Sequence, residues 1–216
     1  MREIILIRKQ SLNKFLRFAL APVAAALTMV AASSSAAVLT TSVSVDNTYS
    51  VYISTANNVQ GTSFGSGADW MTTFTNSTPL VAGTDYFLHV YAHDQGGVAG
   101  FLGEFSLTGG GHKFSNGLTS LTTNTTDWMG NATGFASPYG AVGGHGRDGI
   151  SPWGFRPGIA DSATWIWVGN RESNNDAFFT TAITAVPEPT TVAMLGLGLL
   201  ALGAARRRSA KTGKKA

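Results

Sequence analysis

Two apolar segments without a charged residue, Phe18–Ala32 and Thr191–Ala205, are the strongest constraint on how this chain folds. Runs of this length and composition belong to leader peptides and membrane segments rather than to the elements of a globular domain. They lie near the two ends of a chain of 216 residues. Residues 38–185, between them, are therefore expected to form one domain of ordinary size.

The N-terminal segment has the three parts of a signal peptide. A basic stretch that ends at Arg17 precedes the apolar run, and small residues follow it. Ser35 and Ala37 occupy the third and first positions before a cut, so residues 1–37 are predicted to be a leader that signal peptidase removes after Ala37. Such a leader also implies passage through the secretion translocon. The alternative is an uncleaved anchor, for which the run is short and rich in Ala.

Prolines and arginines bound the C-terminal apolar segment. Pro187 and Pro189 flank Glu188, and two prolines at this spacing keep the backbone extended and accessible to a protease. Three arginines close the segment: Arg206, Arg207 and Arg208. A transmembrane helix is predicted at about 190–205, roughly 23 Å long and slightly shorter than the hydrocarbon core of a bilayer. The arginines would lie in the cytoplasm, with the domain on the outer side.

This arrangement resembles the PEP-CTERM sorting domain of Gram-negative bacteria, because the Pro-Glu-Pro triplet, the Leu- and Gly-rich helix and the arginine cluster occur in the same order and spacing between Val186 and Lys211. The resemblance implies recognition by an exosortase-type membrane transpeptidase, removal of the tail 186–216, and delivery to the cell surface or the extracellular polymer. The basic extension Ser209–Ala216 is longer than usual. A tail anchor that is never processed is the alternative.

The charge of the middle part excludes one class of partner. The chain has a formal net charge of +3, but its basic residues are concentrated at the two ends. Residues 38–185 contain four basic and ten acidic side chains, a net charge of −6. A phosphate-binding surface needs clustered Lys and Arg, so we expect no nucleic-acid partner.

Without any cysteine, the domain can form neither disulfides nor thiolate nucleophiles nor thiolate zinc sites. An exported domain of this kind depends on its hydrophobic core. All five Trp and all five Tyr lie within residues 38–185, which supplies enough large side chains for such a core.

The middle part is expected to be all-β. Apolar and polar residues alternate with a period of two in short stretches, and clusters of Gly, Asn, Asp and Ser separate these stretches. In Tyr86–Ala92, for example, Tyr86, Leu88 and Val90 fall on one side and Phe87, His89 and Tyr91 on the other. The predicted strands are 42–54 with a turn at Asp46-Asn47, 86–92, 101–107, 164–168 and 177–183. Short strands with Gly-rich turns favour an antiparallel sandwich.

Residues 46–103 also resemble the galactose-binding-like jelly rolls of extracellular enzymes and adhesins. Asp46-Asn47 precedes the strand from Tyr49, a Gly-rich loop leads to Trp70, and Asp94–Gly100 forms a Gly-rich turn. The resemblance covers less than half of the domain. It implies a jelly-roll sandwich and allows sugar binding at the ends of the loops.

Five residues are candidate ligand-binding residues because sugar C–H faces stack on aromatic rings and sugar hydroxyls bond to planar polar groups: Asn47, Trp70, Asp94, Trp153 and Arg156. Trp128 lies in a similar Gly- and Asn-rich stretch. The alternative is that these tryptophans cap the ends of the sandwich and pack over its core.

No pattern in the sequence indicates catalysis, a cofactor or a metal. His89 and His93 are four residues apart, but a strand and a following turn do not give the helical spacing of a zinc site. Neither a G-x-S-x-G motif nor a P-loop is present. We therefore expect a binding protein rather than an enzyme, with calcium at loop carboxylates left open.

The function expected from these features is that of an exported cell-surface or extracellular-matrix protein whose domain contacts polysaccharide. The alternative is a purely structural or adhesive surface protein without a small-ligand site.

Overall fold

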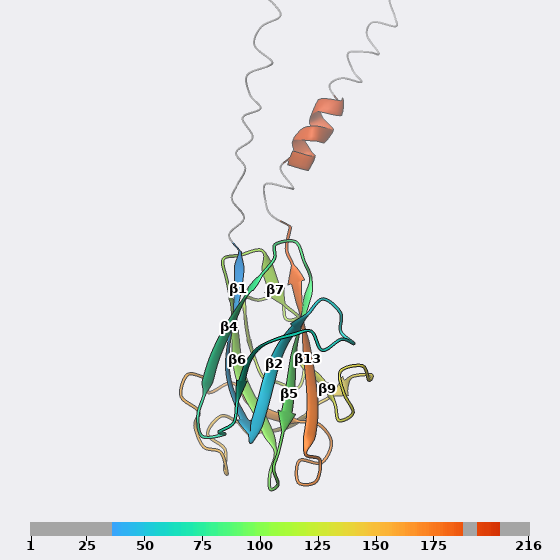
Figure 1. Cartoon of the computed structure of the whole chain (residues 1–216). Helices are drawn as coiled ribbons and strands as arrows, with labels where there is room; N and C mark the ends of the chain where they lie inside the picture. The colour runs from blue at the N-terminus through green and yellow to red at the C-terminus, as the bar shows by residue number, and fades with distance from the viewer. Residues whose placement is uncertain (1–35, 188–193, 204–216) are drawn as a thin grey trace, which may run out of the picture. The chain divides into compact units, whose positions relative to one another are not determined.

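The computed structural model describes residues 36–187 and 194–203 (Figure 1). Thirteen β-strands occupy the first of these ranges: β1 (Ala37–Asp46), β2 (Thr48–Ser54), β3 (Thr62–Gly67), β4 (Phe74–Leu80), β5 (Tyr86–His93), β6 (Gly100–Thr108), β7 (His112–Phe114), β8 (Ser120–Thr122), β9 (Met129–Asn131), β10 (Gly140–Ala141), β11 (Gly143–Arg147), β12 (Thr164–Trp167) and β13 (Asp176–Ala185). The predicted leader, apart from its last two residues, lies outside the described ranges, as do Glu188, Pro189, Arg206, Arg207 and Arg208.

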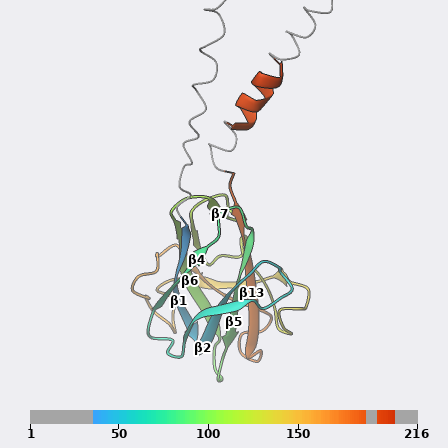
Figure 2. The same cartoon turned by 45° about the horizontal axis from the view of Figure 1, so that its top comes forward.

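The strands form two antiparallel sheets that pack face to face. The first sheet has the order β11-β12-β6-β1-β4, with β8 paired to β6. The second sheet has the order β10-β9-β13-β5-β2-β3, with β7 paired to β13. Figures 1 and 2 show β1, β4 and β6 in one layer and β2, β5 and β13 in the other. The predicted all-β antiparallel sandwich is therefore confirmed, while the strand order of a jelly roll stays a prediction.

The turn predicted at Asp46-Asn47 carries the chain from one sheet to the other. β1 pairs along its length with β6 in the first sheet, and β2 pairs with β5 in the second. Val43 and Val45 of β1 and Val51 of β2 are almost completely buried. The apolar positions of 42–54 thus do face one core, but from two strands in opposite layers.

Aromatic side chains fill the space between the sheets. Trp128 is 1% exposed and packs edge-on against Phe101, with ring centroids 5.3 Å apart. It also contacts Phe105, with centroids 5.0 Å apart and ring planes tilted by 49°. Phe179 of the second sheet meets Phe101 at 4.9 Å. Phe101 and Phe105 are four residues apart on β6. Because side chains alternate with a period of two along a strand, both point to the same core. Burial of these rings holds together a sandwich that has no disulfide.

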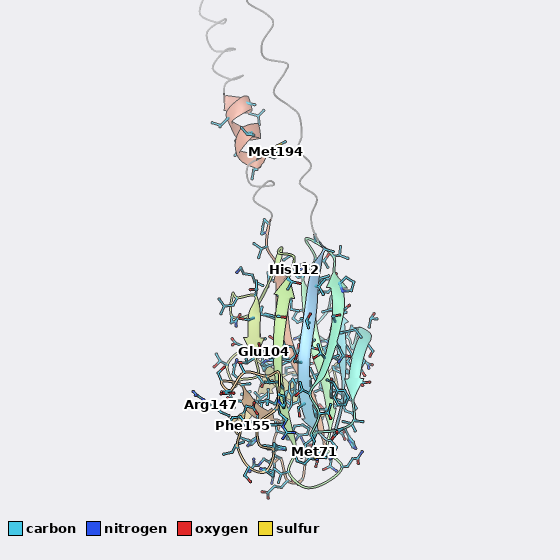
Figure 3. The ribbon with its side chains drawn as sticks, turned by 90° about the vertical axis from the view of Figure 1, so that its left-hand side faces the viewer. Met71, Glu104, His112, Arg147, Phe155 and Met194 are labelled. Carbon is cyan, nitrogen blue, oxygen red and sulfur yellow. The ribbon has the colours of Figure 1, made fainter. Side chains whose placement is uncertain are left out.

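A second hydrophobic cluster lies on the other side of the first sheet, beneath the loop 148–163. Its buried members are Leu102, Trp153, Ile159, Ala163 and Trp165. Leu102 and Trp165 come from β6 and β12, so both strands are apolar on two faces. The Glu104 carboxylate accepts a hydrogen bond of 2.8 Å from the Ala160 amide, which fixes the loop on β6 (Figure 3). This loop gives the first sheet a cover on its outer face.

A helix at 194–203 lies within the predicted C-terminal helix. The flanking positions of the predicted span, 190–193 and 204–205, lie outside the described residues. Among the residues that are described, 36–187 and 194–203, no helix combines the length and the apolar character needed to cross a membrane.

Candidate functional site

The loops at one end of the sandwich contain all five predicted ligand-binding residues. Trp153 is 1% exposed and stacks on Trp165, with ring centroids 4.4 Å apart and planes 19° from parallel. Its indole N–H donates a 3.0 Å hydrogen bond to Asp46, and the Arg171 guanidinium lies 5.7 Å from its ring centroid. Trp153 therefore packs into the second hydrophobic cluster, on the outer face of the first sheet.

Trp70 and Arg156 form a half-buried pair at the same end. The Arg156 guanidinium carbon lies 5.3 Å from the Trp70 ring centroid, a cation–π geometry. Arg156 also donates from Nη1 to the Trp70 carbonyl at 3.1 Å and from Nη2 to the Trp153 carbonyl. Its backbone amide donates to Asp148, whose pKa is raised by burial. Arg156 thus connects two loops through Nη1 and Nη2, while its buried Nε has no hydrogen-bond partner among the described residues.

Asn47 and Asp94 also bond to neighbouring backbone. The Asn47 side-chain oxygen accepts a 2.6 Å hydrogen bond from the Gln95 amide, which joins the sheet-crossing turn to the next loop. Asp94 is 1% exposed and accepts from the Gly96 amide at 3.1 Å. Its Oδ1 is buried without a hydrogen-bond partner among the described residues. Burial raises the pKa of nearby Asp46, and the charge of Asp94 adds to that rise.

Exposed apolar side chains surround this loop end. Met71 and Phe155 are 63% and 67% exposed, and Figure 3 shows both at the end of the sandwich opposite His112.

Within residues 36–187 and 194–203, no group of three or more His, Asp or Glu side chains gathers in the manner of a metal site.

A second candidate site lies on the outer face of the second sheet, where the register of β13, β5 and β2 aligns side chains in rows. The row nearest the loop end is Asp176–His93–Thr48, the next is Phe178–Tyr91–Ser50, and the third is Thr180–His89–Tyr52. We call the side chains of Tyr52, His89, Tyr91, Phe135 and Phe178 the aromatic face. Phe135 belongs to the loop 132–139, which follows β9.

Ring contacts run without a break across the aromatic face. Tyr91 and Phe178, directly opposite each other, stack with centroids 4.9 Å apart. Phe135 meets Phe178 edge-on at 5.0 Å and Tyr52 edge-on at 5.4 Å. His89 is completely buried beneath this layer and stacks on Phe135 at 5.2 Å. Tyr52, Tyr91, Phe135 and Phe178 each remain partly exposed.

A carboxylate and an imidazole border the aromatic face. Asp176 Oδ1 accepts hydrogen bonds from the Tyr91 hydroxyl at 2.7 Å and from His93 Nδ1 at 2.9 Å. The Tyr91 hydrogen bond, followed by that of His93, lowers the pKa of Asp176. Burial together with the Asp176 charge raises the pKa of Tyr91 to about 12, so its hydroxyl keeps its proton. The His93 and Asp176 side chains are 38% and 46% exposed.

The sequence held part of the signal for this second site. Alternation in Tyr86–Ala92 placed Phe87, His89 and Tyr91 on the side opposite the core residues, and β5 has this arrangement. Phe178 and Asp176 were not predicted as site residues, because only the register between β13 and β5 brings them to Tyr91 and His93.

Comparison with known proteins identifies the C-terminal part of the chain. The PEP-CTERM protein-sorting motif matches residues 185–208, which confirms the predicted sorting tail with its Pro187, Glu188, Pro189 and arginine cluster. The helix at 194–203 lies within this motif. The motif supports a protein that an exosortase sorts to the exterior. Neither a curated protein nor a solved structure matches the chain.

Proposed function

We propose that this protein is an exported cell-surface or extracellular-matrix protein whose β-sandwich contacts polysaccharide. The observation that carries the proposal is the sorting motif at residues 185–208. In this scheme the translocon exports the chain, signal peptidase removes residues 1–37, and an exosortase-type membrane transpeptidase removes the tail. The proposed role of the sandwich is binding, not catalysis.

Two features of the sandwich support contact with polysaccharide. Partly exposed rings lie beside an exposed carboxylate and imidazole, a combination that suits the apolar faces and hydroxyl edges of sugars. The domain also has a net charge of −6, which disfavours polyanionic partners such as nucleic acid.

The second candidate function, a structural or adhesive protein without a small-ligand site, has its own support. Trp128 and Trp153 are each 1% exposed, and Asn47, Asp94 and Arg156 bond to backbone within the loops. On this view the loop end stabilises the sandwich and binds nothing.

The sorting part is tested by replacing Pro187, Glu188 and Pro189 together with alanine. We expect the variant to stay cell-associated at its full C-terminal length, because the transpeptidase no longer recognises it, while the released wild-type protein lacks the arginine cluster by intact-mass measurement. Deletion of residues 209–216, outside the matched motif, is the control and should leave release unchanged. Released wild-type protein that still ends at Ala216 would contradict the proposal.

The polysaccharide part is tested with the released protein on an array of bacterial and plant polysaccharides. Binding to at least one polysaccharide above the background of bovine serum albumin is expected. Absence of binding to every polysaccharide would favour the structural or adhesive function.

A further inference from the structure

We propose that the outer face of the second sheet, at Tyr91, Phe178 and Asp176, is a subsite for a neutral polysaccharide chain. This inference rests on the proposed function and names the binding surface and the ligand class. The surface differs from the loop end to which the sequence pointed.

The composition of this face is the first argument. An antiparallel sheet that packs on one side and meets water on the other carries polar residues at its outer positions. The row Phe178–Tyr91–Ser50 instead places two stacked rings at adjacent outer positions of β13 and β5. Packing beneath the loop 132–139 accounts for His89, which is completely buried. Phe135 of the same loop also packs edge-on against Phe178, yet Phe178 and its neighbour Tyr91 both remain partly exposed.

The polar groups supply the second argument. Asp176 uses Oδ1 for both Tyr91 and His93, and within the described residues its Oδ2 accepts no hydrogen bond. His93 bonds through Nδ1, which leaves Nε2 on the side away from Asp176. An acceptor oxygen and a ring nitrogen therefore lie beside two rings, fixed before any ligand arrives. Preorganisation of this kind lowers the entropic cost of binding.

Sugar rings match this arrangement. A pyranose has C–H groups on its face, which contact an aromatic ring, and hydroxyls at its edge, which donate to a carboxylate oxygen and to the lone pair of an imidazole nitrogen. The rows cross three strands, so the surface is on the order of 10 Å wide. A chain of sugar residues can lie across it.

Charge disfavours polyanionic ligands at this face. The face carries Asp176, and the domain as a whole has a net charge of −6. Of its four basic residues, Arg147, Arg156 and Arg171 lie on β11 or in loops, and Lys113 lies on β7 opposite Thr184, near the end of β13 far from Asp176. A polyanion such as alginate would meet repulsion at this surface without a compensating cation.

The experiment is affinity electrophoresis of the released protein in native gels that contain laminarin, mannan, dextran, galactan or alginate. We expect retardation by at least one of the four neutral polymers and none by alginate. Tyr91→Ala and Phe178→Ala should weaken binding about tenfold or more, because each removes a stacking ring. Asp176→Asn should weaken it about threefold to tenfold through the lost carboxylate acceptor. Tyr91→Phe keeps the ring and should retain most of the affinity.

Two control variants separate this surface from the loop end. Phe155→Ala removes a ring that is 67% exposed in the loop 148–163, and Trp70→Ala removes the ring beneath Arg156. Both should bind like the wild type. Circular dichroism and the thermal midpoint of each variant establish that it is folded, and only folded variants are compared.

Three results would overturn the inference. If folded Tyr91→Ala and Phe178→Ala bind like the wild type while Trp70→Ala does not, the subsite is wrong and the proposed function stands. Absence of retardation by every neutral polymer would remove the inference and the polysaccharide part of the proposed function together. If the face variants instead convert a dimer to a monomer in sedimentation velocity, the face is an interface between copies of this chain.

Discussion

At the scale of single residues, His89 shows how an imidazole becomes part of an aromatic layer. It lies at an outer position of β5, yet it is completely buried by the loop 132–139 and by Asn57 and Gln60. Its two ring nitrogens lie 3.4 Å from the Gln60 carbonyl and 3.4 Å from the Asn57 side-chain oxygen. Burial lowers its pKa below the ordinary value of 6.5, so the ring is neutral at pH 7.

The lowered pKa of His89 makes stability depend on pH in a defined direction. As the pH falls through 6.5, the unfolded chain takes up a proton that the folded chain still excludes, so the free energy of unfolding decreases. His89→Phe keeps a ring in the layer and should show a smaller decrease in thermal midpoint between pH 7 and pH 5 than the wild type. Its stability at pH 7 should be lower by about 1 kcal/mol, because the one hydrogen bond that the neutral imidazole donates is lost.

A control for this effect is His145, whose pKa is also lowered by burial, with a contribution from Arg171. His145→Gln should remove a separate part of the decrease in thermal midpoint between pH 7 and pH 5. The double variant should show the smallest decrease. Equal slopes for the wild type and His89→Phe would contradict the assignment.

At the scale of elements, the loop 148–163 is a structural cover for the first sheet. Trp153 from this loop stacks on Trp165 of β12, and both rings lie against Gly100 at the start of β6. A Cβ at Gly100 would lie 2.7 Å from Trp153 Cζ2 and 2.8 Å from Trp165 Cε3. Glycine is required at this position because the stacked indoles occupy the space of a side chain.

Gly100→Ala should therefore destabilise the sandwich by about 1–3 kcal/mol, the usual cost of overpacking. The matched control is Gly140→Ala on β10, where a Cβ would meet nothing within 4 Å. Urea unfolding followed by tryptophan fluorescence measures both variants. If the two substitutions cost the same, the close approach of the indoles to Gly100 does not determine the effect.

At the scale of the whole molecule, the folded sandwich ends where the sorting motif begins. The Ala185 amide donates to the Asp85 carboxylate at 2.7 Å, and the Val186 amide donates to the Gly111 carbonyl at 2.8 Å. These bonds fix the end of β13 directly before Pro187. Removal of the tail by a transpeptidase would thus leave every strand of the sandwich in place.

A chain that ends after Pro187 should consequently unfold within about 2 °C of the chain with its tail. Truncation after Thr180 is the contrasting variant, because it removes the half of β13 that pairs with β7 and with the start of β5. That variant should not fold. Differential scanning calorimetry gives the comparison, and a large loss of stability in the first variant would show that the tail contributes to the fold.

Local patterns made much of this architecture predictable. Period-two alternation identified the strands around residues 86–92, 101–107, 164–168 and 177–183, and the structure has β5, β6, β12 and β13 there. Strands such as β3 and β4, with the sequences TSFGSG and FTNSTPL, escaped prediction because they lack a regular apolar face. They form at the edges of the sheets, where pairing with β2 and β1 decides their conformation.

By itself, the sequence determined the C-terminal sorting motif and the fold class, since both the motif and the strand alternation depend on residues that are close together in the chain. The tertiary structure alone decided which aromatic residues are core and which form a surface. Trp153 is buried because Trp165 and the loop 148–163 enclose it, whereas Tyr91 and Phe178 meet through a pairing of strands far apart in the chain. Such contacts depend on long-range register, which alternation along one strand does not encode.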